Sequence, residues 1–157
     1  MAKFHLKDFF KASYDLMLVL LQFFIISLHF FQLEFLPQKQ IIQASPFSYS
    51  LGILIIVIAF IIMLVSIKDL GRNLSPFPRP ISDSNLVTTG IYRFTRHPMY
   101  YSLIFISFGV FITNLSIYYL FLSISLGLII KSKIALEEQY LNNKFKNYLI
   151  YKNEVKY

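Results

Sequence analysis

Three long stretches without formal charge constrain the fold of this chain more than any other feature. Asp, Glu, Lys and Arg are absent from residues 16–33, 50–67 and 98–130. Because a helix rises about 1.5 Å per residue, roughly 20 apolar residues cross a hydrocarbon core about 30 Å thick. Only 15% of the 157 residues are charged and 56% are hydrophobic, whereas soluble domains carry about 25% charged residues. The sequence therefore predicts an integral membrane protein.

The last of these runs, residues 98–130, is too long for one span and predicts a tight helical hairpin. Its polar cluster Thr113-Asn114-Leu115-Ser116 marks the turn, and the second helix is expected to continue past Ile130 into the charged tail. We therefore predict an all-α fold in a single membrane domain, residues 1–157. The expected elements are four spans at about 16–36, 50–67, 99–113 and 117–132, a loop at 68–98 and a helical tail at 133–157.

The basic residues are distributed unevenly, which predicts the orientation in the membrane. Fourteen of the fifteen Lys and Arg lie in the N-terminal tail, in residues 68–97 or in the C-terminal tail, whereas residues 37–49 hold only Lys39. Because loops rich in Lys and Arg remain in the cytoplasm, both termini and the 68–98 loop are predicted to be cytoplasmic. The net charge of +7 thus indicates topology and contact with anionic lipid rather than nucleic acid, for which no motif is present. Without cysteine, thiolate metal sites are excluded and no metal is expected.

The 68–98 loop collects most of the polar residues that could do chemistry. Its prolines, at 76, 78, 80 and 98, forbid one continuous helix. A loop of about 30 residues is usually either functional or disordered. Apolar residues recur between the prolines, from Leu74 to Phe94, and favour an ordered, packed loop.

Two polar clusters at this side of the membrane each allow two interpretations. Arg96-His97-Pro98 opens the third span, where a helix amino end beside an arginine can bind an anion. Alternatively, Arg96 is only a positive anchor and His97 an interfacial side chain. Lys133 and Glu137 lie one helical turn apart and form either an exposed ion pair or a pair that holds charged ligand groups.

Two longer segments carry a resemblance to a known family. The stretch LGRNLSPFPRPISDSNLVTTGIYRFTRHPMYYSL, followed by EEQYLNNKFKNYLIYKNEV, resembles the isoprenylcysteine carboxyl methyltransferase and phospholipid N-methyltransferase superfamily. The family pattern is roughly LV-x-x-G-x-Y, then RHP-x-Y, a helical hairpin, and EE-x-x-L-x-x-x-F-G-x-x-Y-x-x-Y. The resemblance runs from about Leu70 to the C-terminus.

This resemblance implies a methyltransferase that uses S-adenosylmethionine, with a cofactor pocket formed by the loop and the tail. It implies that the adenosine site is lined by Ser84, Asn85, Leu86 and Val87, with Tyr92 close by. It places His97, Pro98, Met99 and Tyr100 at the methionine portion, and Glu137, with Glu138 beside it, at the α-ammonium group. Lys133 stands where carboxyl methyltransferases have an arginine near the acceptor carboxylate, and Arg96 and His97 are the predicted catalytic residues.

The resulting functional hypothesis is methylation of a membrane lipid or lipidated acceptor, at a carboxyl oxygen or an amine nitrogen. Two alternatives remain open, a non-catalytic membrane adaptor on the same scaffold and a nicotinamide-dependent reductase of related architecture. A chain of this size is compatible with a homo-oligomer, although no small-xxx-small face stands out in the sequence.

Overall fold

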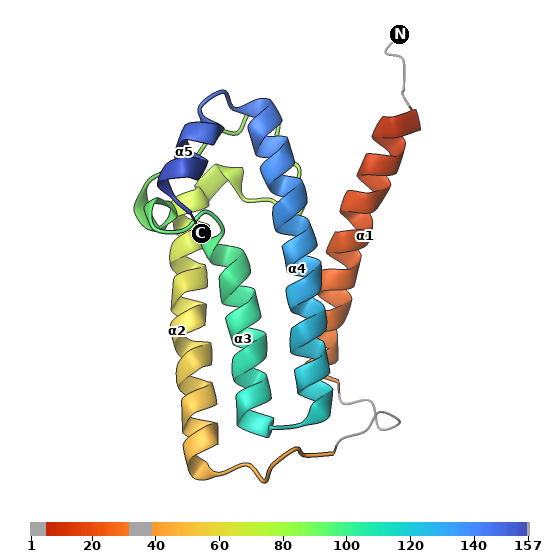
Figure 1. The fold of residues 1–157 in the computed structure, drawn as a ribbon, viewed down its shortest axis with the longest axis vertical. Helices are drawn as coiled ribbons and strands as arrows, with labels where there is room; N and C mark the ends of the chain where they lie inside the picture. Colours follow the sequence, from red (N-terminus) through yellow and green to blue (C-terminus); the bar gives the residue numbers. More distant parts are fainter. Residues whose placement is uncertain (1–5, 32–38, 157) are drawn as a thin grey trace.

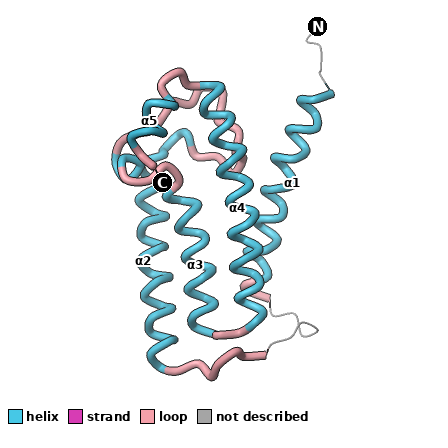
Figure 2. The backbone as a smooth tube through the Cα atoms, viewed as in Figure 1, coloured by secondary structure: helices cyan, strands magenta, loops and turns pink. Residues whose placement is uncertain are grey.

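The computed structural model describes residues 6–31 and 39–156, and the elements within them are helical. The helices are α1 (Leu6–Leu28), α2 (Pro46–Leu70), α3 (Pro98–Asn114), α4 (Ile117–Lys144) and α5 (Tyr148–Glu154), with short 3-10 helices η1 (Gly71–Asn73) and η2 (Gly90–Arg93). Figure 1 shows α2, α3 and α4 side by side, with α1 leaning away from α4 toward its N-terminal end. The connection 71–97 and α5 gather at one end of this bundle (Figure 2), which we call the loop end. The all-α prediction is confirmed for the described residues.

Three helices are long and apolar enough to cross a membrane, namely Lys11–Leu28, Pro46–Asn73 and Ile117–Lys144. The remaining apolar helix, α3, has 17 residues and is shorter than these. The first helix differs from its predicted span of 16–36, because it begins at Leu6 and ends at Leu28. Residues 32–36 of that span lie outside the described residues.

The predicted hairpin between the third and fourth apolar helices is confirmed. Helix α3 ends at Asn114 and α4 begins at Ile117. Between them, Leu115 adopts left-handed backbone angles (φ 46°, ψ 39°), and its N–H donates to the carbonyl of Phe111. The Ser116 side chain accepts a hydrogen bond from the backbone N–H of Tyr118 and so caps α4. Helix α4 then continues to Lys144, as the charged tail indicated.

Helices α2 and α3 approach each other closely along a seam of small residues. The buried residues of α2 are Gly52, Ala59 and Ser66, spaced by seven. A Cβ atom built on Gly109 of α3 would lie 2.9 Å from the carbonyl oxygen of Gly52. Small residues allow such contact between backbones, which is a main source of helix association in lipid. The seam therefore sets the distance between α2 and α3.

Helix α1 is attached to the rest of the bundle by apolar packing and by hydrogen bonds at its C-terminal end. Ile25 joins the core of α3 and α4, which contains Tyr100, Tyr118, Tyr119, Leu122, Leu126 and Ile130. The Tyr118 hydroxyl contacts the carbonyl of Leu28 at 2.7 Å, and the His29 Nε2 atom lies 2.7 Å from the Ser107 hydroxyl. Such bonds satisfy polar groups where lipid offers no partner.

The loop at 71–97 follows a path fixed by the two long helices. At the end of α2, the Asp69 carboxylate accepts the backbone N–H of Ile91 at 2.8 Å. Gly90 has a φ of +61°, and a Cβ there would lie 2.0 Å from the Asp69 carboxylate, so only glycine fits. From the end of α4, Lys144 Nζ donates to the carbonyl of Ile81, to that of Ser82 at 2.8 Å and to the Ser84 hydroxyl at 2.8 Å.

The close contact between α2 and α3 predicts that replacing Gly109 by alanine destabilises the protein far more than the same replacement at Gly127. We expect Gly109→Ala to destabilise the protein by about 1–3 kcal/mol, because overpacking a tight contact forces backbones apart. The new methyl group would meet Ile56 Cγ1 at 2.6 Å as well as the Gly52 carbonyl. Gly127→Ala in α4 is the matched control, because no atom lies within 4 Å of its Cβ position. Thermal unfolding in detergent checks both, and equal unfolding temperatures would contradict the close α2–α3 contact.

Candidate functional site

A cavity of about 70 Å³ lies at the loop end, enclosed by the loop, the end of α4 and α5. Among the predicted site residues, it is lined by Ser84, Asn85, Leu86, Val87, Tyr92 and Arg96. Its other walls come from Leu70, Asn73, Pro80, Leu141, Phe145, Tyr148 and Tyr151. The structure thus brings together the whole set of residues that the resemblance assigns to the adenosine site.

The loop wall of this cavity, residues 84–87, is held in place by hydrogen bonds and by packing against α5. The Asn73 side-chain oxygen accepts the backbone N–H of Asn85 at 3.1 Å. The Ser84 hydroxyl donates to the carbonyl of Ile81 at 2.7 Å. Leu86 packs against the buried face of α5. The segment therefore presents an ordered wall of mixed polar and apolar groups.

Two tyrosines fasten the opposite wall to the loop. The Tyr151 hydroxyl of α5 donates to the carbonyl of Tyr92 at 2.6 Å. Burial raises the pKa of Tyr151 to about 12 and raises the pKa of Tyr92 further. Both phenols therefore keep their protons at neutral pH and act as neutral hydrogen-bonding groups.

Tyr148 also lines the cavity, but its hydroxyl, unlike that of Tyr151, makes no hydrogen bond to another described residue. The residue is only 1% exposed, and its hydroxyl has no hydrogen-bond partner in the part of the chain that the structure describes. Burial raises the pKa of this phenol as well. Neither Tyr148 nor Tyr151 was predicted as a site residue, although their spacing of three in a helical tail indicates that they share one face.

The Glu138 carboxylate of α4 contacts two cationic side chains, Arg96 and Lys152, and the His97 ring. Its Oε1 atom accepts from Arg96 Nε at 2.9 Å and Nη2 at 2.8 Å, and lies 3.4 Å from His97 Nε2. Its Oε2 atom accepts from Lys152 Nζ of α5 at 2.6 Å. Both oxygens are therefore engaged by the chain itself, and the contacts join the start of α3 to α4 and α5.

Arg96 makes a second connection, to the end of α5. Its Nη1 atom donates to the carbonyl of Val155 and lies 3.5 Å from that of Lys152. The side chain is 12% exposed. Of the two interpretations of Arg96-His97-Pro98, a mere surface anchor does not fit, because Arg96 is turned inward and holds the C-terminal turn over the cavity.

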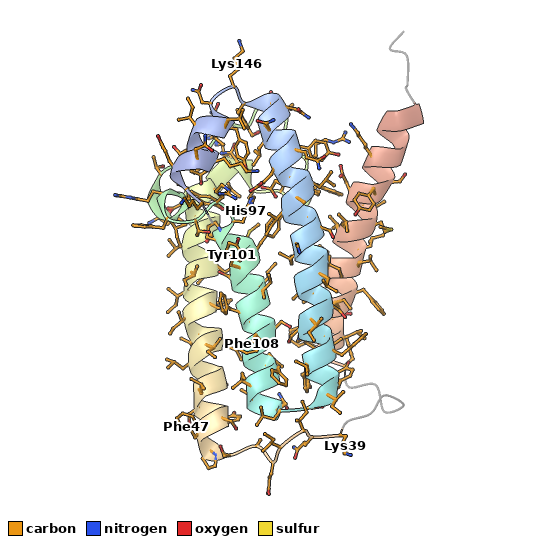
Figure 3. All side chains as sticks on the ribbon, viewed as in Figure 1. Lys39, Phe47, His97, Tyr101, Phe108 and Lys146 are labelled. Atoms are coloured by element: carbon orange, nitrogen blue, oxygen red, sulfur yellow. The ribbon has the colours of Figure 1, made fainter. Side chains whose placement is uncertain are left out.

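A second group of predicted residues lies beside this cluster, between α3 and α4. The buried His97 ring stacks on the Tyr100 ring, with centroids 5.8 Å apart and planes at 26°. Figure 3 shows His97 at the loop end of α3. The Tyr100 hydroxyl pairs with the Glu137 carboxylate, which also lies within electrostatic reach of His97 and Lys133. Glu137 keeps part of its surface accessible.

Lys133 is not part of an exposed ion pair, because it is only 1% exposed. Its ammonium donates to the side-chain oxygen of Gln22 in α1 at 2.5 Å and to the carbonyl of Pro76 in the loop at 2.9 Å. It also lies 5.2 Å from the centroid of the Tyr100 ring. An ammonium group has three donors, so two of them are already used within the chain.

The last two predicted residues lie apart from the cavity. Pro98 is buried in the first turn of α3, and Met99 packs against the core that contains Tyr100 and Leu126. Neither lines the cavity beneath α5. The predicted residues thus form two neighbouring groups, which Arg96, His97 and Glu138 connect.

The sequence was compared with known protein families, curated proteins and solved structures. Comparison with curated proteins and with solved structures gives no significant match. In residues 6–31 and 39–156, no cluster of His, Asp and Glu could hold a metal ion. The family described as phospholipid methyltransferase matches residues 47–148, from the start of α2 to the start of α5. Because this match covers more than half of the chain, the protein belongs to the phospholipid methyltransferase family, within the superfamily of small membrane methyltransferases that its motifs resemble.

Proposed function

We propose that this protein transfers a methyl group from S-adenosylmethionine to a lipid-like or lipidated acceptor at the cytoplasmic face of a membrane. The observation that carries the proposal is the cavity beneath α5, where Ser84, Asn85, Leu86, Val87 and Tyr92 converge. Family membership supports the reaction type. The three long apolar helices support a membrane setting.

The proposed topology has four spans with both termini in the cytoplasm. Helix α3 has only 17 residues, but it runs between α2 and α4 along the bundle (Figure 1), so we propose that it crosses with them. Figure 3 shows Lys146 and Lys39 at opposite ends of the bundle. The proposed topology places the other basic residues of the tails and of the 68–97 segment on the same side of the membrane as Lys146. Their excess supports a cytoplasmic loop end.

The residues present suit this cofactor chemically. The apolar side chains of Leu141 and Phe145 line the cavity together with the loop wall, and such a lining suits a flat adenosine group once α5 has moved outward. The partly accessible Glu137 carboxylate can attract an α-ammonium group. When bound, S-adenosylmethionine would supply an electrophilic methyl group on a positively charged sulfur. Arg96 and Glu138 contact each other and the α5 segment, so we assign them to positioning the cavity wall.

Entry of the cofactor requires α5 to move away from the loop. A cavity of about 70 Å³ is much smaller than the roughly 300–1,000 Å³ of most small-molecule sites. An open hollow of about 810 Å³ adjoins it and shares Leu86, Phe145 and Tyr151 as lining residues. A small outward shift of α5 would join the two spaces.

A groove between α2 and α3 offers a place for the hydrocarbon chain of the acceptor. It has a volume of about 440 Å³ and a lining that is almost entirely apolar, from Ile55, Ile58, Ala59, Ile62, Thr95, Pro98, Tyr101, Ser102 and Phe105. It ends at Thr95, whose hydroxyl oxygen is buried without a partner among the described residues. Because Thr95 lies two residues before His97, a chain in this groove would bring its polar end toward the site.

The contacts of Lys133 favour an amine over a carboxylate as the methyl acceptor. A carboxylate would need a cation to hold it, but two of the three donors of the Lys133 ammonium already bind Gln22 and Pro76. An amine is protonated near neutral pH and must lose a proton before it attacks, which calls for a base. The Nε2 atom of His97 faces Glu138 as a donor, which leaves Nδ1 with the lone pair that accepts a proton.

The first prediction tests the cofactor site. We expect Glu137→Gln to weaken binding of S-adenosylhomocysteine, the demethylated cofactor, about tenfold or more, because hydrogen bonds to charged groups contribute about 1.5–3 kcal/mol. Calorimetric titration of detergent-purified protein measures this affinity. The unfolding temperature of the variant without ligand is the control for folding. Undiminished affinity in a folded Glu137→Gln protein would contradict the assignment.

The second prediction tests the acceptor group. Protein in vesicles that contain a phospholipid with a primary-amine head group is incubated with S-adenosylmethionine labelled in its methyl group. We expect label in the lipid that mild alkali does not release as methanol, because an N-methyl bond survives this treatment, whereas a methyl ester releases methanol. Label released as methanol, from this lipid fraction or from an added prenylated cysteine, would instead establish a carboxyl acceptor.

A further inference from the structure

The Tyr148 hydroxyl is a buried polar group that the fold leaves without a partner. Its side chain packs with Tyr151 and Val155 on the inner face of α5, and the residue is 1% exposed. The neighbouring Tyr151 hydroxyl, in contrast, donates to the Tyr92 carbonyl at 2.6 Å. Tyr148 lines the cavity beneath α5, and its hydroxyl oxygen has no hydrogen-bond partner among the described residues.

Such a hydroxyl destabilises the protein unless something binds it. Burying a polar group without a hydrogen bond loses its contacts with water and gains nothing in return. Phenylalanine would fill the same space without this loss. The Arg96 side chain, which also lines the cavity, is committed elsewhere, because it pairs with Glu138 at 2.8 Å. The missing partner therefore has to come from a molecule that enters the cavity.

We propose that the Tyr148 hydroxyl donates a hydrogen bond to a ring nitrogen of the cofactor's adenine and so selects for that base. This assignment rests on the proposed function, which places adenosine in the cavity. The walls around Tyr148 are the apolar and aromatic side chains of Leu86, Leu141 and Phe145, which suit a flat heteroaromatic ring. Because burial keeps the phenol protonated, the hydroxyl acts as a donor, and the unprotonated nitrogens of adenine are acceptors.

In this proposal, α5 both covers the cavity and contributes a residue that binds the ligand. Tyr148 lies at the start of this helix, and Lys152 and Val155 at its end are held by Glu138 and Arg96. A hydrogen bond from Tyr148 would join α5 directly to the bound ligand. Cofactor binding and docking of α5 then stabilise each other.

The test compares Tyr148→Phe with Tyr151→Phe, using S-adenosylhomocysteine and detergent-purified full-length protein. Tyr148→Phe removes only the unpartnered hydroxyl, so we expect the unfolding temperature without ligand to stay equal or rise. Calorimetric affinity should fall about threefold to tenfold, the usual range for one hydrogen bond. Tyr151→Phe breaks an internal bond and should lower the unfolding temperature without ligand.

Ring-modified ligands identify the acceptor atom. The wild-type protein is titrated with S-adenosylhomocysteine analogues in which carbon replaces one ring nitrogen at a time. We expect one analogue to bind about threefold to tenfold more weakly than the parent compound, and Tyr148→Phe to bind that analogue and the parent equally. Equal affinity of wild type and Tyr148→Phe for the parent compound would overturn the assignment while leaving the proposed function intact. Failure of the folded wild-type protein to bind S-adenosylhomocysteine would overturn the proposed function and this assignment with it.

Discussion

The ion cluster around Glu138 is the interaction on which the loop end of this protein depends. Glu138 is 14% exposed and Arg96 is 12% exposed, so these two charges are largely shielded from water, whereas the Lys152 side chain is 42% exposed. Removing one member of such a pair leaves the other charge buried without compensation, which is strongly destabilising. The cluster joins three segments that are far apart in sequence, because Arg96 precedes α3, Glu138 lies in α4 and Lys152 lies in α5. The cavity exists because these three are held together.

A second constraint acts from inside the membrane region. The contact between Gly52 and Gly109 keeps α2 and α3 close, and Asp69 in the last turn of α2 holds the loop through Ile91. The start of α3 and the end of the loop are therefore fixed to the same helix pair. The polar chemistry at the loop end is thus positioned by packing in the apolar part of the bundle, where small residues rather than water-driven burial determine the distance between helices.

The positions of most helices could be predicted from the sequence, whereas the contacts between the helices could not. Charge-free runs and the Thr113–Ser116 cluster located the hairpin, because lipid allows only a closed helical backbone. The start of α1 at Leu6 was not predicted, since Lys11 and Asp15 look like a polar tail. Asp15 is nonetheless buried and bonded to Tyr140 of α4. Likewise the motifs identified residues that line the cavity beneath α5. The partners of Lys133, and the Tyr148 hydroxyl left without a partner among the described residues, depend instead on which distant segments meet.

Four consecutive residues separate the two spaces that a membrane methyltransferase must bring together. Thr95 and Pro98 line the apolar groove between α2 and α3, whereas Arg96 lines the cavity beneath α5. His97 lies between them and is buried against Tyr100 and Glu138. Under the proposed function, only these residues separate the space for the acceptor chain from the space for the cofactor. The acceptor and the cofactor would then meet at the buried His97, where the apolar surroundings would keep water from competing for the methyl group.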